Sequence, residues 1–309
     1  MDTPQDHDRY ADRTDDRDDL LGVVVGVDGS RIGLDAVRWA VAEARLRGLP
    51  LRILHAAPYA AGSTAGTRHA RDILARAYTV AHRADLDLPV TTRHTERDAV
   101  PSLLDAAQRA QLLVVGMGGG ERPQEVLIGS VALGVSGHSP CPVVVVRGAH
   151  RPPADAPVLV GVDDPATDAA ALTVAFGDAH RHGGRVVVLH AGHGDPFGGH
   201  RHHSEALAPW TGRFPDVPVE LTVVPGSPVS ALLAAAVEAR LVVLGTRARR
   251  APARALFGST SRAVLRRSSV PVVVVNPGAV HLTESPVTAP AAPPTSRTDI
   301  QDPHDRSRL

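Results

Sequence analysis

The chain has 309 residues, of which 43% are hydrophobic and only 3% aromatic, and its formal net charge is zero. This length suggests about two domains, with cores built from valine, leucine and alanine. The neutral balance provides no field that would favour nucleic acid or acidic lipid, so we expect neither as a partner. The single cysteine, Cys141, excludes an intrachain disulfide, fits a reducing cytosol and is expected to be a buried structural thiol.

The two ends of the chain are predicted to be disordered. Residues 1–19 include eight aspartates and three arginines with little to bury, so we predict an acidic tail over residues 1–20. Residues 278–309 are rich in proline, threonine and alanine and form a second predicted tail. Neither a targeting segment nor an apolar run long enough to cross a membrane is evident, and we expect a cytoplasmic protein.

Apolar runs and amphipathic segments alternate from Leu21 onward. The run 21–27 is nearly continuous and ends in Gly-Val-Asp-Gly-Ser at 26–30, which favours a strand covered on both faces, as in a parallel sheet. Ser30 is a candidate N-cap for the following helix, and Gly48 is its expected end. Further strands are predicted over 51–56, 88–95, 112–115 and 143–146, and helices over 67–84, 98–110 and after Ser130. This βαβαβαβαβ order predicts a doubly wound parallel sheet.

A glycine pattern follows the fourth predicted strand. Gly116, Gly119, Gly129 and Ser130 have the spacing G-x2-G-x9-G-S. Glycine lets the backbone approach a ligand closely and adopt positive φ. A Gly-Ser pair that opens a helix suits an anion such as a phosphate. A glycine-rich turn without a ligand is the alternative, because short glycine motifs often match by chance.

The whole pattern restarts after a proline-rich connector. A strand over 158–162 ends at Asp163, as the first strand ends at Asp28, and Leu-His-Ala recurs at 54–56 and 189–191. The 116–129 spacing recurs at 245–258. We therefore predict a tandem repeat, with one domain over 21–148, a linker over 149–156 and a second domain over 157–277. Its other strands are predicted over 185–191, 217–224, 241–244 and 270–275, and its helices over 166–182, 204–212, 228–240 and after Gly258.

These motifs resemble those of ATP-binding members of the universal stress protein family. The resemblance implies two five-stranded parallel sheets of strand order 3-2-1-4-5, an adenine nucleotide alpha hydrolase-like fold. It also implies ATP, with or without Mg²⁺, at the carboxyl ends of the first and fourth strands, where the switch-point rule also places a ligand. The residues that the resemblance assigns to binding are Gly26, Val27, Asp28, Ala56, Val115, Gly116, Gly119, Gly129, Ser130 and Val131 in the first domain, and Asp163, Ala191, Gly245, Gly258, Ser259 and Thr260 in the second. For Asp28, a cap of its own loop is the alternative.

The second repeat departs from the pattern. Ala248 replaces the middle glycine, and Asp164-Pro165 replaces Gly29-Ser30. A Cβ at position 248 would crowd a phosphate, whereas the arginines at 247, 249, 250 and 254 either offset phosphate charge or form a solvated surface. We therefore expect the better ATP site in the first domain and leave nucleotide binding by the second open.

No catalytic machinery is apparent. The chain has no P-loop lysine motif, no G-x-S-x-G elbow and no H-E-x-x-H. We therefore predict a nucleotide-dependent stress-response or regulatory protein with no catalytic residue and at most weak ATP hydrolysis. The alternatives are a nucleotide-free interaction or dimerisation module and a slow ATPase.

The histidines and the fifth strands bear on ligands and partners. Histidines at 180, 182, 193, 200, 202 and 203 favour a mobile polar loop over a metal site, because they lack helical spacing. The resemblance implies that the fifth strands, 143–146 and 272–275, pair within the chain. It leaves a further homodimer open.

Overall fold

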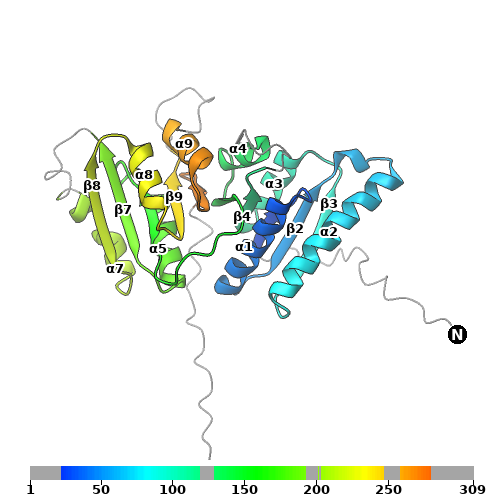
Figure 1. The fold of residues 1–309 in the computed structure, drawn as a ribbon, viewed down its shortest axis with the longest axis horizontal. Coiled ribbons are helices and arrows are strands. Elements are labelled where there is room, and N and C mark those ends of the chain that lie inside the picture. Colours follow the sequence, from blue (N-terminus) through cyan, green and yellow to red (C-terminus); the bar gives the residue numbers. More distant parts are fainter. Residues whose placement is uncertain (1–21, 119–128, 193–200, 202, 247–257, 280–309) are drawn as a thin grey trace, which may run out of the picture.

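In a computed structural model of the chain, residues 22–118, 129–192, 201, 203–246 and 258–279 are described. They form two halves with nearly the same order of elements (Figure 1). The first half comprises β1 (Gly22–Gly26), α1 (Arg31–Arg47), β2 (Leu51–Ala56), η2 (Pro58–Ala60), α2 (Thr64–Ala84), β3 (Val90–Thr95), α3 (Ala99–Ala107), β4 (Ala110–Gly116), α4 (Ser130–Ser136) and β5 (Val143–Val146). The second comprises β6 (Val158–Gly161), α5 (Ala169–Arg181), β7 (Val186–Gly192), α7 (Ala208–Arg213), β8 (Val219–Pro225), α8 (Pro228–Ala236), β9 (Leu241–Gly245), α9 (Ser259–Arg267) and β10 (Val272–Val275).

The strands form one ten-stranded sheet in the order β3-β2-β1-β4-β5-β10-β9-β6-β7-β8. Neighbouring strands within each half are parallel, so each half has the predicted order 3-2-1-4-5. At the centre, β5 and β10 run antiparallel, with Val144 opposite Val273. The fifth strands therefore pair within the chain, as predicted.

Helices cover both faces of the sheet. One apolar cluster combines residues of α1, α2 and α5 with alternate strand residues such as Val144 and Val146. The other combines residues of α3, α4, α8 and α9 with the intervening residues Val143 and Val145. Because successive side chains of a strand point to opposite faces, a strand buried on both faces must be apolar throughout, and β5 is Val-Val-Val-Val.

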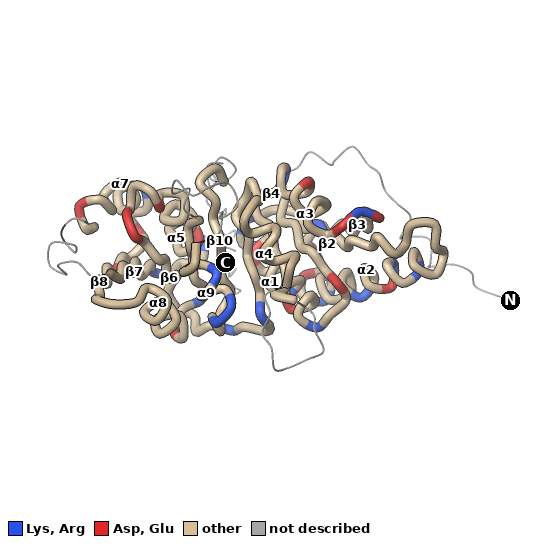
Figure 2. The backbone as a smooth tube through the Cα atoms, turned by 90° about the horizontal axis from the view of Figure 1, so that it is seen from above, with Lys and Arg blue, Asp and Glu red and all other residues tan. Residues whose placement is uncertain are grey.

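Charged positions of both signs occur in each half (Figure 2). Among the described residues, no helix is long and apolar enough to cross a membrane.

The sequence signals for helix ends were partly correct. The Ser30 side chain accepts a hydrogen bond from the Gly33 N–H at 3.0 Å, and Gly48 ends α1 with φ of 63°. These confirm the predicted cap and stop. Asp98 precedes α3, but its side chain makes no capping bond. The helix predicted over 166–182 begins only at Ala169, after a turn that begins at Asp164-Pro165.

Cys141 is a fully buried free thiol, as predicted. Burial raises its pKa to about 11, with hydrogen bonds from Ser139 and the backbone opposing the rise. The neutral thiol therefore dominates at physiological pH, which fits a structural role next to β5. The two predicted terminal tails lie outside the described residues, apart from Gly278 and Ala279.

An ion pair and a histidine–carboxylate contact cross between the halves on the α1 and α5 side of the sheet. Arg47 of α1 binds Asp178 of α5 at 2.6 Å, and His182, just after α5, approaches Glu43 of α1 at 2.8 Å. Arg181 also contacts Asp178. Adding 135 to residues 43 and 47 gives 178 and 182, so each half contributes the same two positions and the pairing is reciprocal.

Burial makes this network costly to interrupt. Burial lowers the pKa of Arg47, but Asp178 and Glu43 more than compensate and raise it above its ordinary value. Burial likewise raises the pKa of Asp178, but Arg47 and Arg181 outweigh it and the net shift is downward. Each charge is thus stabilised by two opposite charges, and loss of one of them leaves a buried charge only partly compensated.

We predict that Asp178→Ala lowers the free energy of unfolding by about 3–5 kcal/mol, because buried Arg47 is left with Glu43 alone and Arg181 loses its partner. Urea unfolding followed by circular dichroism measures the loss. Asp105→Ala is the control, because the Arg97–Asp105 pair is more than half exposed and such pairs contribute about 0–1 kcal/mol. Equal midpoints for the two variants would contradict the prediction.

Candidate functional site

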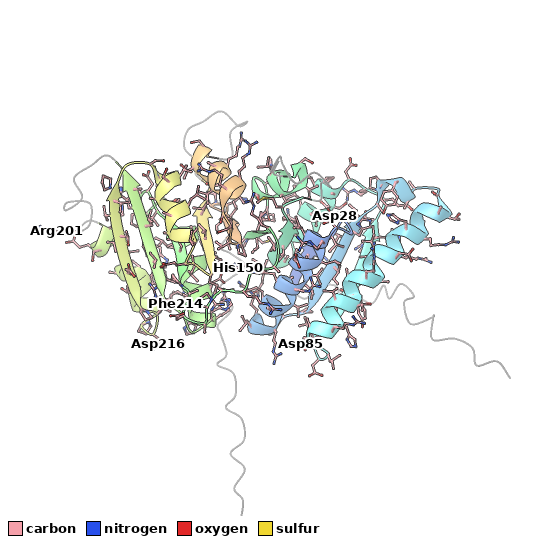
Figure 3. All side chains as sticks on the ribbon, viewed as in Figure 1. Asp28, Asp85, His150, Arg201, Phe214 and Asp216 are labelled. Carbon is pink, nitrogen blue, oxygen red and sulfur yellow. The ribbon has the colours of Figure 1, made fainter. Side chains whose placement is uncertain are left out.

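The candidate site of the first half lies where the order of strands reverses. β2 and β4 flank β1, and the chain leaves β1 and β4 on different faces of the sheet. Ligands of open parallel sheets bind at the carboxyl ends of the strands at such a point. Gly26 and Val115 are paired at this edge, and Figure 3 shows Asp28 there, far from Asp85 at the opposite edge.

The loop between β1 and α1 is held by its own polar groups. The Ser30 N–H donates to Asp28 Oδ1 at 2.9 Å, so the loop-cap alternative for Asp28 describes one of its interactions. Asp28 is nonetheless exposed, which leaves its carboxylate accessible to a ligand. Gly29 has φ of 85°, in the region that favours glycine. Gly33 lies in the first turn of α1, where a Cβ would come within 2.8 Å of Asp28 Oδ1.

The glycines after β4 allow close backbone approach. A Cβ on Gly116 would lie 3.3 Å from the Gly33 nitrogen, and a Cβ on Gly129 would lie 2.9 Å from the Met117 carbonyl oxygen. The Gly129 N–H donates to that same oxygen at 2.7 Å. The two ends of the glycine stretch therefore meet, and Ser130 begins α4 beside the end of β4. Gly119 lies outside the described residues.

A buried histidine holds the backbone that precedes Asp28 in place. The ring of His55, on β2, lies 2.7 Å from the Val27 carbonyl oxygen through Nδ1 and 2.8 Å from the Tyr59 hydroxyl through Nε2. These distances assign the proton to Nδ1, with Nε2 accepting from Tyr59. Burial lowers the pKa of His55, although its bond to Val27 opposes the shift. His55 thereby fixes the residue that precedes Asp28. Sequence reasoning noted its repeat but not this role.

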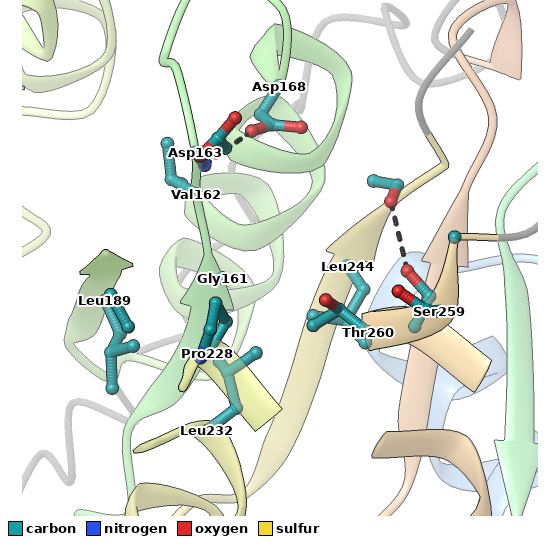
Figure 4. A pocket seen from close by; sticks show the side chains of 14 residues that line it. Gly161, Val162, Asp163, Asp168, Leu189, Pro228, Leu232, Leu244, Ser259 and Thr260 are labelled. Atoms are coloured by element: carbon teal, nitrogen blue, oxygen red, sulfur yellow. Dashed lines mark hydrogen bonds between the residues drawn. The ribbon is translucent and has the colours of Figure 1, made fainter. Parts of the chain in front are cut away.

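The second half has a pocket of about 220 Å³ at the corresponding place (Figure 4). This volume is slightly below the roughly 300–1,000 Å³ typical of small-molecule pockets. The residues that sequence reasoning selected in this half all line it: Asp163, Ala191, Gly245, Gly258, Ser259 and Thr260. Apolar side chains of Val162, Leu189, Leu232 and Leu244 form much of the rest.

Among the lining residues that sequence reasoning did not select, Asp168 is the acidic one. Asp168 is only 4% exposed, and its Oδ2 accepts hydrogen bonds from the N–H groups of Asp163 at 2.8 Å and Asp164 at 3.3 Å. It lies five residues after Asp163, as Gly33 lies five residues after Asp28. Comparing the two repeats at that offset would have revealed it. Ala248 and the neighbouring arginines at 247, 249, 250 and 254 lie outside the described residues.

The described histidines of this cluster make specific contacts. His182 contacts Glu43, His180 contacts Phe214 at 5.8 Å between ring centroids, and the ring of His203 is tilted against that of His190 at 4.4 Å. His203 is buried, so the prediction of a polar loop is wrong for that residue. The other three, at 193, 200 and 202, lie outside the described residues.

Fold and site together define a class of protein: two doubly wound domains in one chain, paired through their fifth strands, each with a glycine-flanked edge. The model of the universal stress protein family matches residues 22–147 and 199–276. The chain belongs to the universal stress protein family.

Relatives of similar length support this assignment. Universal stress protein Rv2623 of Mycobacterium tuberculosis (strain H37Rv) is 34% identical over 284 residues, covering 82% of this chain and 96% of that protein. Universal stress protein Rv2005c of the same strain is 32% identical over 283 residues, with the same coverage. The crystal structure of a universal stress protein from Archaeoglobus fulgidus DSM 4304 shares the fold, with a TM-score of 0.67, 21% identity, and coverage of 83% of this chain and 98% of that one.

We predict that His55→Asn makes the melting temperature less sensitive to acid. Because the folded-state pKa of His55 is below its ordinary value of 6.5, the unfolded chain takes up the proton first as pH falls. Stability from this group is therefore complete above about pH 6.5 and is lost below it. Melting curves from pH 7.5 to 5.0 measure the slope, with the exposed His138→Asn as control. If the melting temperature of His55→Asn fell with pH as steeply as that of wild type, this role of His55 would be contradicted.

Proposed function

We propose that the protein is a cytoplasmic, adenine-nucleotide-binding regulatory protein whose principal ATP site lies in the first half. The observation that supports this best is the close approach of Gly116 to Gly33, and of Gly129 to Met117, beside an exposed Asp28. Glycines at these positions bring the backbone segments close together at the edge where such sheets bind ligands.

The residues of the first half have chemistry that suits a nucleotide. Asp28 can accept hydrogen bonds from ribose hydroxyls or a base amine, which are neutral donors. Ser130 provides its backbone N–H and its hydroxyl for phosphates, and Ala56 leaves room at the end of β2. Mg²⁺ would accompany the phosphates rather than be held by a cluster of protein ligands, since the described residues include no group of three or more that could hold a metal ion.

We assign a regulatory role rather than catalysis. Around the first edge, Ser30 accepts from the Gly33 N–H, and buried His55 donates to Val27 and accepts from Tyr59. Asp28 is exposed and accepts from the Ser30 N–H through Oδ1. None is arranged as a base for water or an acceptor. A change of ATP occupancy would instead alter the loops above the sheet and thereby the choice of partner.

We expect freshly purified protein to release adenine nucleotide on denaturation, detected by mass spectrometry, and to rebind ATP by isothermal titration. Asp28→Ala should weaken ATP binding roughly tenfold or more, because it removes a ribose or base acceptor.

Asp163→Ala, the same position in the second half, is the matched control and should leave the first ATP bound with unchanged affinity. If wild type neither carries nor rebinds nucleotide, the nucleotide-free interaction module replaces this proposal. A turnover above about 1 s⁻¹ would instead indicate an ordinary ATPase.

A further inference from the structure

We propose that the pocket of the second half selects a neutral nucleoside of the adenosine type and rejects its phosphorylated forms, with Asp168 as the residue that determines this specificity. The proposal rests on the proposed function in one respect: the two halves present related nucleotide-type edges. It adds that the edges differ in the ligand they take.

The two halves differ at one position in the first turn of the first helix. Gly33 in the first half corresponds to Asp168 in the second. Gly33 has no side chain to place beside Gly116, and its backbone nitrogen is 3.3 Å from where a Gly116 Cβ would be. In the second half, Asp168 Oδ1 lies only 2.9 Å from where a Gly245 Cβ would be. In the first half, the neighbours of a Gly116 Cβ would instead be Ile32 Cγ2 at 3.1 Å and the backbone of α1. The second half therefore places a carboxylate at the end of β9, where the first half has an apolar side chain and backbone.

Asp168 is fixed in this position. Its other oxygen accepts the N–H groups of Asp163 and Asp164, and the side chain is almost fully buried while it lines the pocket (Figure 4). Two backbone donors that could meet a ligand in the second half are thus already used. A carboxylate held by two donors cannot turn away at low cost when a ligand enters.

Charge at this edge favours neutral ligands. Asp163 and Asp168 line the same pocket as Gly258 and Ser259, where the first half would place phosphates. Like charges in a partly buried site repel strongly, because solvent screens them poorly. The same carboxylates are good acceptors for ribose hydroxyls or an exocyclic amine, which are neutral donors.

The remaining lining suits a planar base. Leu189, Leu232 and Leu244 provide an apolar surface, and the volume of about 220 Å³ is small for a complete nucleotide. Apolar walls with a few placed acceptors are the usual composition of a small-molecule pocket. A nucleoside satisfies both parts of this lining without placing a phosphate beside Asp168.

Isothermal titration of the full chain with ATP, in EDTA and in Mg²⁺, and with adenosine tests the proposal. Wild type should bind one ATP and two adenosines. Asp168→Asn keeps an acceptor for the backbone N–H groups but removes the charge, so it should bind a second ATP. Its second-site affinity for ATP should rise about 100-fold over wild type, while the first ATP keeps its affinity. Asp168→Gly, which also removes the bulk, should gain the second ATP as well.

The reverse substitution tests the first half. Gly33→Asp should lose the first ATP, whereas Gly33→Ala, whose Cβ would come within 2.8 Å of Asp28 Oδ1 but adds no charge, should weaken it less. Melting curves confirm that each variant is folded.

The outcomes separate this proposal from the preceding one. Two ATP molecules bound by wild type, in EDTA or in Mg²⁺, would overturn selection by Asp168. A single ATP in both Asp168 variants would overturn it too. Adenosine binding without any ATP binding would refute the ATP site of the first half but support the nucleoside pocket. No binding of either ligand would refute both.

Discussion

The antiparallel pairing of β5 with β10 is the interaction on which the rest of the structure depends. Each strand consists of four valines, and all eight side chains are buried. Unpaired, each would be an apolar sheet edge with free backbone N–H and C=O groups. Pairing removes both edges at once and leaves only β3 and β8 as outer strands, where polar side chains are accommodated.

Polar contacts connect this central pairing to the functional edges. Arg147, just after β5, reaches the Ser268 carbonyl at the end of α9 and also Met117 Sδ, beside the glycine stretch. Asn276, at the equivalent place after β10, reaches the Ser139 carbonyl at 2.8 Å and bonds to Thr246. Met117 directly follows Gly116, and Thr246 directly follows Gly245. Each candidate site therefore lies next to a residue that bonds to Arg147 or Asn276, two side chains that reach the other half. A change at either site acts close to the interface between the halves.

Duplication followed by divergence explains the asymmetry of the molecule. The scaffold is repeated closely, down to a histidine that bonds the carbonyl before each first-strand aspartate: His55 to Val27 and His190 to Val162. The halves differ at the carboxyl edge, where Asp168 of the second half takes the position of Gly33. They also differ at the interface, where His182 takes the position of Arg47. Core positions tolerate little change because they are buried on both sides, whereas edge positions can diverge without loss of the fold.

The sequence by itself determined the order of elements, the duplication and the parallel sheets. Valine runs that end in Gly-Val-Asp or Gly are typical of strands buried on both faces of a parallel sheet, and their recurrence reveals the second half. The spacing of Gly116 and Gly129 was visible in the sequence, but the approach of Gly116 to Gly33 was not. Only the tertiary structure decided what Asp168 and His182 do. The carboxylate of Asp168 lies beside Gly245, 77 positions away in the chain, and His182 contacts Glu43 in the other half. Such partners are set by how the helices pack on the sheet, and local patterns do not contain that information.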